Sequence, residues 1–282
     1  MTSVSASAPA TAANLGPAFD TIALAIDLRC EVKAEPADEW SVDHVGPFRP
    51  GDGESDGVLT AARQSVGEDF PLALEVNAAV PIAKGLGSSA SAFVSGVAAA
   101  LRARDGEANI DKVYRIAVEL EGHADQVAAS VYGGLALIPG EGPPLRLPLH
   151  PSLRPIIAVP EGNQPTAPAR AILEQHQPLD RVIRSLGRVS ALTAGLITGN
   201  LEYLAAAHGD EIHEEPRNAL GPEAGLLMEA ARRAGAVHVS RSGTGPSVLA
   251  FVQADGVEKV SAAFSEMGAM VLDRPIATTG LI

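Results

Sequence analysis

The run Val80-Pro-Ile-Ala-Lys-Gly-Leu-Gly-Ser-Ser-Ala90 stands directly before an apolar pattern at Phe93, Val97 and Leu101. Apolar residues that recur every four positions form one stripe on a helix, so the glycine and serine run is predicted to stand at a helix N-terminus. Glycines let the backbone approach a ligand, and the free amides of the first turn favour an anion. The stretch predicts a phosphate-binding loop, with a plain capped helix as the alternative.

The two serines of this run, Ser88 and Ser89, offer hydroxyls that could bond a phosphate or reach a Mg²⁺ ion. The run is not a Walker A loop, because no Gly-Lys-Ser/Thr follows a four-residue gap, and no strand followed by Gly-x-Gly-x-x-Gly suggests a dinucleotide. The spacing therefore does not indicate which phosphorylated ligand the loop binds.

The composition is that of an ordinary globular protein with few aromatic residues. The 282 residues are 46% hydrophobic and 4% aromatic, so the core is expected to consist of aliphatic residues and alanine. Lys and Arg number 21 against 34 Asp and Glu, which gives a formal net charge of −13. Such a surface repels a phosphate backbone and an anionic membrane, so neither nucleic acid nor a membrane is expected as a partner.

The single cysteine, Cys30, cannot form an internal disulfide, which is typical of a reducing compartment. The first residues lack the basic and apolar regions of a secretory signal, and the most continuous apolar stretch, near residues 90–101, is too short to span a bilayer. We therefore expect a cytoplasmic protein.

Strand-like and helical patterns alternate along the chain and predict an α+β fold in two parts. A Pro and Gly cluster at residues 139–144 predicts a boundary near 140–152, hence domains 1–150 and 151–282. Residues 34–57 show no periodicity and are expected to form turns and loops. Strands are expected at residues 72–76, 156–159, 237–239 and 248–252, and a helix from Val257.

The helix that ends before Gly122 carries a carboxylate on its apolar side. Asp111 is a plausible N-cap and Gly122 a plausible terminator. The column Val113 and Ala117 continues four residues on to Glu121, which is therefore predicted to point inward, where a bare charge is costly unless it is paired or bound to a metal. A frayed helix end is the alternative.

Three motifs in order resemble those of the GHMP kinases, the kinases of galactose, homoserine, mevalonate and phosphomevalonate. They are Pro9-Ala-Thr-Ala-Ala-Asn-Leu-Gly-Pro-Ala-Phe-Asp20, the loop at residues 81–90, and Val239-Ser-Arg-Ser-Gly-Thr-Gly-Pro-Ser247. The resemblance implies a ribosomal S5 domain 2-like N-terminal domain and a ferredoxin-like C-terminal domain, with ATP and a small substrate between them. It implies ATP binding at Lys84, Gly85, Leu86, Gly87, Ser88 and Ser89, and Mg²⁺ binding at Ser89 and Glu121.

Within that family the chain is most similar to the homoserine kinases. Gly122-His-Ala-Asp-Gln126 resembles their His-x-Asp-Asn run, which implies that His123 and Asp125 contact the substrate and are the nearest candidates for a catalytic base. Deprotonation of the substrate by its own phosphate is equally open. Gln126 stands where Asn is usual, and its longer side chain would change hydrogen bonding to a small substrate.

Two arginines suit a substrate carboxylate, because a guanidinium can make two parallel hydrogen bonds. Thr166-Ala-Pro-Ala-Arg170 and the segment from Asp210 to Arg217 resemble homoserine kinase segments, so the resemblance implies that Thr166, Arg170 and Arg217 bind the substrate. In this resemblance Asp20 would bind the ammonium of the substrate, and Asn14 would bind the polar end of the substrate. For both arginines an ordinary surface position is the alternative.

Departures from the family pattern leave the identity of the phosphoryl acceptor undetermined. Ala12 and Ala18 replace Ser and Gly, and Arg241 replaces an apolar residue in the last motif. The expected activity is transfer of the ATP γ-phosphate to L-homoserine in threonine biosynthesis. The alternatives are a GHMP kinase for threonine, shikimate or a mevalonate-like alcohol, and a catalytically silent protein that binds nucleotide. The resemblance also allows a homodimer.

Overall fold

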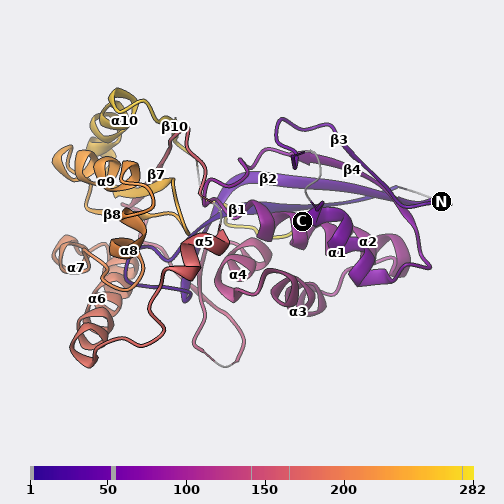
Figure 1. The fold of residues 1–282 in the computed structure, drawn as a ribbon, viewed down its shortest axis with the longest axis horizontal. Helices are drawn as coiled ribbons and strands as arrows, with labels where there is room; N and C mark the ends of the chain where they lie inside the picture. The colour runs from indigo at the N-terminus through magenta and orange to yellow at the C-terminus, as the bar shows by residue number, and fades with distance from the viewer. Residues whose placement is uncertain (1–2, 52–54, 141, 165, 275) are drawn as a thin grey trace.

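The computed structural model describes residues 3–51, 55–140, 142–164, 166–274 and 276–282. Two sheets lie side by side, one formed by each half of the chain, and each is covered by helices (Figure 1). The predicted α+β class is confirmed. Among the helices of the described residues, none combines the length and apolar composition needed to cross a membrane.

The first sheet is organised around its long second strand. Its strands are β1 Val4–Ala13, β2 Ile22–Pro36, β3 Ser41–His44, β4 Leu72–Ala78, β5 Leu135–Leu137 and β6 Leu145–Leu147. β1 pairs antiparallel with β2 along one edge, while β4 and β5 pair with opposite ends of the other edge. β3 runs parallel to β4, and β6 antiparallel to β5. The sheet therefore brings the end of β1 beside the helices that follow β4.

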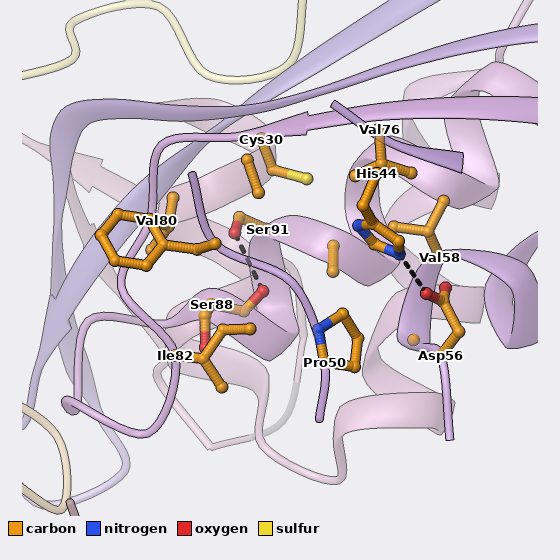
Figure 2. Close-up of a pocket in the computed structure, with 14 residues that line it drawn as sticks. Cys30, His44, Pro50, Asp56, Val58, Val76, Val80, Ile82, Ser88 and Ser91 are labelled. Atoms are coloured by element: carbon orange, nitrogen blue, oxygen red, sulfur yellow. Dashed lines mark hydrogen bonds and ion pairs between the residues drawn. The ribbon is translucent and has the colours of Figure 1, made fainter. Parts of the chain in front are cut away.

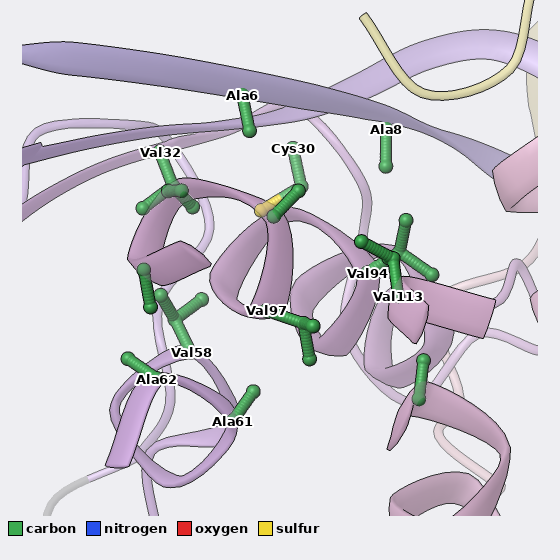
Figure 3. Close-up of a cluster of buried hydrophobic side chains, with 14 of the residues drawn as sticks. Ala6, Ala8, Cys30, Val32, Val58, Ala61, Ala62, Val94, Val97 and Val113 are labelled. Atoms are coloured by element: carbon green, nitrogen blue, oxygen red, sulfur yellow. The ribbon is translucent and has the colours of Figure 1, made fainter. Parts of the chain in front are cut away.

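Four helices lie on one face of this sheet (Figure 1). They are α1 Gly57–Val66, α2 Ser88–Asp105, α3 Ile110–Glu121 and α4 Ala124–Tyr132. The core between them is rich in alanine and valine, as the low aromatic content predicts: Figure 3 shows Ala6 and Ala8 of the sheet with Val94 and Val97 of α2. Small side chains let α2 lie close to the strands, which places its N-terminus near the end of β1.

The second sheet has the order β10-β7-β9-β8, all antiparallel. Its strands are β7 Arg154–Val159, β8 His238–Arg241, β9 Val248–Val252 and β10 Met270–Leu272. The accompanying helices are α5 Thr166–Ala171, α6 Leu179–Thr198, α7 Leu201–Ala206, α8 Glu214–Asn218, α9 Glu223–Arg233, η1 Ala254–Gly256 and α10 Val257–Glu266. Ile156 and Ala158 pack toward α9 and α10, whereas Ile157 and Val159 pack toward α6, because successive strand residues face opposite sides.

One hydrophobic cluster crosses from the first half to the second. It joins Leu24 and Ile26 of β2 to Leu192 of α6 and Phe251 of β9. The last residues also return to the first half, where Ser7 and Ile282 exchange two backbone hydrogen bonds of 2.9 Å. The two halves therefore share a hydrophobic cluster, and residue 282 lies beside β1 of the first half.

Several predicted elements agree with the structure and two do not. β4, β7, β8, β9 and α10 lie where the sequence places them, and the change of sheet falls between residues 147 and 154. The N-cap of α3 is Asn109 and not Asp111, because the Asn109 side chain accepts a hydrogen bond of 3.0 Å from the Lys112 amide. Residues 34–57 are not all loop: they include the end of β2, and β3, which alternates exposed and half-buried residues on the sheet edge.

Candidate active site

The glycine and serine run stands at the N-terminus of α2, as predicted. Gly87 is the N-cap and has φ +64°, a left-handed conformation that glycine adopts without strain. A Cβ atom on Gly87 would overlap Thr11 Oγ1 and lie 2.9 Å from Gln126 Oε1. Only glycine fits here, and the loop backbone is pressed between the end of β1 and α4.

Replacing Gly87 with alanine is expected to lower the free energy of unfolding by about 2–3 kcal/mol and to raise about tenfold the KM for ATP, the ligand expected at this loop, because the new Cβ adds overlap to left-handed strain. Gly106→Ala is the matched control: Gly106 has φ +83°, but no atom lies within 4 Å of its Cβ position. It should cost about 1 kcal/mol and leave the KM unchanged. Denaturation and initial rates measure both effects, and equal losses in the two variants would contradict the close contact at Gly87.

Gly85, two residues earlier, packs against residues 242–247 of the C-terminal motif, which we call the second glycine loop. A Cβ there would overlap Ser242 O and lie 2.7 Å from Gly245 O. The Ser242 hydroxyl donates to Gly85 O at 2.7 Å, and the Ser247 amide donates to Lys84 O at 3.2 Å. The C-terminal motif thus supports the loop before α2 by direct contact.

Two of the residues expected to bind ATP have their side chains turned elsewhere. The Lys84 ammonium donates to the carbonyls of Pro160, Glu161 and Gly162, at 2.8 Å to the first and last, and burial lowers its pKa. Leu86 is buried in the core. These side chains fix the loop, so any contact that Leu86 makes with ATP is confined to its backbone.

Glu121 reaches the phosphate loop from the last turn of α3. The side chain of Ser89, the second residue of α2, lies close enough to this carboxylate to lower its pKa. Burial raises the pKa of Glu121, against the opposing effects of Ser89 and of the positive charge of Arg170. The predicted inward direction is confirmed, and two hard oxygen donors from different helices now stand together.

These two oxygens fit a magnesium ion bound partly by a ligand. Mg²⁺ usually takes one or two carboxylates from the protein and its other ligands from phosphates and water. Within the described residues no group of three or more His, Cys, Asp or Glu could hold a metal alone. A carboxylate and a hydroxyl beside a phosphate loop therefore suit this ion.

The loop after β1 is closed by Asn14. Asn14 and Asp20 both have positive φ, +73° and +55°. Asn14 Nδ2 donates to Gly243 O at 3.0 Å, and its Oδ1 accepts from the Asp20 amide at 3.0 Å. Asn14 thus fixes the conformation of the loop that presents Asp20 and ties it to the second glycine loop.

Asp20 and Arg170, predicted separately as substrate residues, meet in a bidentate ion pair. The two nitrogen to oxygen distances are 2.5 and 3.0 Å, and the side chains are 35% and 31% exposed. Because both groups reach solvent, a cation and an anion stand side by side at an open surface. A small zwitterion could exchange partners with both.

Arg217, on α8, is almost entirely buried at 1% exposure. Its Nε donates to Ala169 O at 3.2 Å, and its Nη1 contacts His213 Nδ1 at 2.8 Å and Gly243 O at 3.3 Å. Its Nη2 has no hydrogen-bond partner within the described residues. Burial and the charge of Arg170 lower the pKa of Arg217 to about 10, so the guanidinium stays charged and keeps one donor for an anion.

His213 was missed by the sequence predictions, although it lies four residues before Arg217 in the same motif. Its Nε2 donates to Gly16 O at 2.7 Å, so Nδ1 must accept the Arg217 hydrogen and the imidazole is neutral. Burial lowers the pKa of His213 to about 4, which agrees with this tautomer. His213 therefore anchors Arg217 to the loop after β1.

Phe19 was also missed, although it stands in the N-terminal motif directly before Asp20. Its ring stacks on His213 with centroids 5.0 Å apart. The guanidinium carbons of Arg170 and Arg217 lie 5.2 and 5.5 Å from the ring centroid. Phe19 thus spaces the two arginines with favourable cation–π contacts.

Asp125 lies in the first turn of α4 and is 1% exposed. Neither of its carboxylate oxygens has a side-chain partner among the described residues. Burial, and then the negative charge of Asp20, raise the pKa of Asp125 to about 7. His123, the N-cap of α4, is half-buried, and burial and Arg170 lower its pKa. Asp125 therefore has the acidity expected of a proton acceptor near neutral pH.

Two other predicted substrate residues lie at the edge of this group. Gln126 Oε1 accepts a hydrogen bond of 3.2 Å from Thr11 Oγ1, beside Gly87. Thr166 is exposed at the start of α5, one helical turn before Arg170. Gln126 thus contacts the phosphate loop, and the described residues give Thr166 no side-chain hydrogen bond.

The charged groups act on one another electrostatically. Asp20 and Arg170 both influence the pKa values of His123, Asp125 and Arg217. Arg170 also acts on Glu121 beside the phosphate loop. The structure therefore joins a helix N-terminus suited to an anion, an oxygen pair suited to Mg²⁺, a buried carboxylate and a mixed-charge pair. Such an arrangement suits transfer of a phosphoryl group to a small charged molecule.

Comparisons with known proteins match both halves. The model described as "GHMP kinases N terminal domain" matches residues 56–134, and "GHMP kinases C terminal" matches residues 174–269. Homoserine kinase of Thermus thermophilus is 38% identical over 256 residues, covering 87% of this chain and 86% of that protein. That of Moorella thermoacetica is 35% identical over 252 residues, covering 86% and 85%. The crystal structure of homoserine kinase from Cytophaga hutchinsonii has a TM-score of 0.87 at 28% identity, covering 99% of this chain and 96% of that one.

Proposed function

Because the chain belongs to the GHMP kinases, we propose that it transfers the γ-phosphoryl group of ATP to the side-chain hydroxyl of L-homoserine, giving O-phospho-L-homoserine and ADP. Relatives that are 34–38% identical over most of the chain are homoserine kinases, which supports this acceptor. The observation that carries the proposal is the mixed-charge pair of Asp20 and Arg170 beside the free donor of Arg217.

An amino-acid acceptor needs both signs of charge. Asp20 would bind the homoserine ammonium, and Arg170 with Arg217 Nη2 would bind the carboxylate. Mevalonate carries a carboxylate but no ammonium, so it would leave Asp20 paired only with Arg170. The site therefore favours a zwitterion over the isoprenoid alcohols.

The triphosphate would lie on the amides of residues 85–89 at the N-terminus of α2. Ser89 and Glu121 would hold Mg²⁺, which neutralises charge on the transferring phosphoryl group when bound. Asp125 accepts the hydroxyl proton as the acceptor oxygen bonds to the γ-phosphorus and the bond from that phosphorus to the β,γ-bridging oxygen breaks. ADP leaves with the bridging oxygen.

A hollow next to the phosphate loop suits the base of ATP (Figure 2). Ser88 and Ser91 of α2 line one side, and Cys30 and Val76 of the sheet, with Val80 after β4, supply apolar contacts. His44 and Asp56 form a 2.5 Å pair at the other end. A flat base here would have its phosphates at the α2 N-terminus.

Phosphorus NMR of the complete reaction tests the proposal. With ATP, Mg²⁺ and L-homoserine, a phosphomonoester resonance should grow with the ADP resonances and match synthetic O-phospho-L-homoserine. Inorganic phosphate as the sole new product, at the rate seen without homoserine, would contradict it.

His213→Phe should raise the KM for homoserine about tenfold with a smaller change in kcat, because the ring stays against Phe19 while Arg217 loses the shortest of its three hydrogen bonds. The exposed residue His176 supplies the control His176→Phe, which should leave both constants unchanged. Steady-state kinetics with both substrates measure this. An equal rise in the KM for ATP would show that His213 acts on the whole fold and not on Arg217.

A further inference from the structure

A second hollow lies in the C-terminal half and shares no ligand-binding side chain with the active site described above. Its volume is about 750 Å³. Residues 160–164, the turn before α9, α9 itself and the turn before β10 form its walls, with Arg241 and Pro246 at the base.

Arg241 gives this hollow a buried cation. The side chain is 1% exposed, and its Nη2 donates to Asn218 Oδ1 at 2.7 Å and to Gly221 O at 2.9 Å. Its Nε has no hydrogen-bond partner within the described residues. The Arg241 amide donates to Glu214 Oε1 at 2.6 Å, and the negative charge of Glu214 opposes the effect of burial on the pKa of Arg241. The guanidinium thus keeps an unused donor on a lining residue of the hollow.

An anionic group stands near Arg241. Glu223 is exposed at the start of α9, acts electrostatically on Arg241, and forms no ion pair with the described residues. Its Oε2 lies 3.2 Å, and Gln164 Oε1 3.7 Å, from the position that a Cβ would take on Gly221. A carboxylate and an amide oxygen therefore stand beside the turn whose carbonyl binds Arg241.

The rest of the lining is apolar and open. Leu220, Leu226 and Met267 are large side chains that all remain exposed. Glu161 adds a second negative charge to the wall. A polyanion would be repelled by the two glutamates, and a simple cation by Arg241, so the lining suits a molecule with both charges and an apolar part.

We propose that this hollow binds a zwitterionic α-amino acid with an aliphatic side chain. Arg241 takes the carboxylate, Glu223 and the Gln164 side-chain oxygen take the ammonium, and Leu226 and Met267 contact the side chain. By the resemblance an apolar residue is expected at this position of the motif, and the described residues show no hydrogen bond from the Arg241 guanidinium to the residues proposed to bind phosphate or the acceptor. The site is separate from the proposed kinase reaction and does not depend on it.

Isothermal titration calorimetry of the full chain with L-leucine, L-isoleucine and L-valine tests the proposal. At least one should bind with a stoichiometry of one, unchanged by saturating L-homoserine. The corresponding N-acetyl amino acid, which lacks the ammonium, and the amide, which lacks the carboxylate, should each bind at least about tenfold more weakly. The amide tests the Arg241 contact even if Arg241→Met fails to fold.

Glu223→Gln should weaken binding about tenfold, because the ammonium loses its charged acceptor. Glu229→Gln is the control on the same helix, since Glu229 pairs with Arg232 and Arg233 outside the hollow. No binding of the three amino acids at about 10 mM would overturn the proposal. Displacement by L-homoserine, or equal affinity in Glu223→Gln, would do the same.

Discussion

Replacing Asp125 with asparagine is expected to reduce kcat about a thousandfold while the KM for ATP stays nearly constant. Asparagine keeps the size of the side chain but cannot accept the hydroxyl proton. Since Asp125 is buried without a side-chain partner, removing its charge should not destabilise the fold. Thermal unfolding of the variant separates loss of chemistry from loss of structure.

The pH profile gives a second readout of the same residue. Because burial raises the pKa of Asp125 to about 7, the free enzyme should lose kcat/KM as the pH falls through about 7, where the carboxylate becomes protonated. The residual activity of Asp125→Asn should lack this acidic limb. A wild-type kcat in Asp125→Asn would instead favour deprotonation of the acceptor by the phosphate itself.

Replacing Arg217 with methionine should raise the KM for L-homoserine about a hundredfold, because a buried charge-assisted contact is removed while an apolar stem of similar length fills the space. The KM for ATP should change little, since the loop before α2 is held by Ser242, Gly245 and Ser247, and within the described residues no hydrogen bond joins it to Arg217.

Arg233→Met is the matched control, because Arg233 is an exposed arginine whose only ion-pair partner among the described residues is Glu229. It should leave both KM values unchanged. Equal increases for both substrates in Arg217→Met would show that Arg217 supports the fold of the site and does not bind the acceptor.

Local signals predicted the parts of the site that depend on neighbouring residues. The glycine run before Phe93 placed the α2 N-terminus, and the four-residue column ending at Glu121 placed an inward carboxylate. The resemblance to the GHMP kinases is confirmed by the matches to both halves of the chain. Asp20 and Arg170 were each predicted as substrate residues, but the ion pair between them was not predicted.

The remaining features depend on contacts between distant residues. Asn14 bonds a carbonyl 229 positions away, and Thr11 bonds Gln126 across 115 positions. Neither sequence neighbourhood indicates its partner. The ammonium of Lys84 was expected near phosphate, yet it binds a turn in the other half of the chain. When a side chain can form several alternative hydrogen bonds, tertiary packing and not the local motif determines which partner it binds.

A coupled ADP-release assay with Mg²⁺ and ATP tests the choice of acceptor most directly. L-Homoserine, L-threonine, shikimate and mevalonate are compared at equal concentrations, with ATP binding measured separately. The paired charges of Asp20 and Arg170 predict a kcat/KM for the two amino acids at least about a hundredfold above that for shikimate or mevalonate, and the proposed function makes homoserine the better of the two amino acids. A preference for shikimate or mevalonate, or no turnover with any acceptor despite ATP binding, would contradict the account.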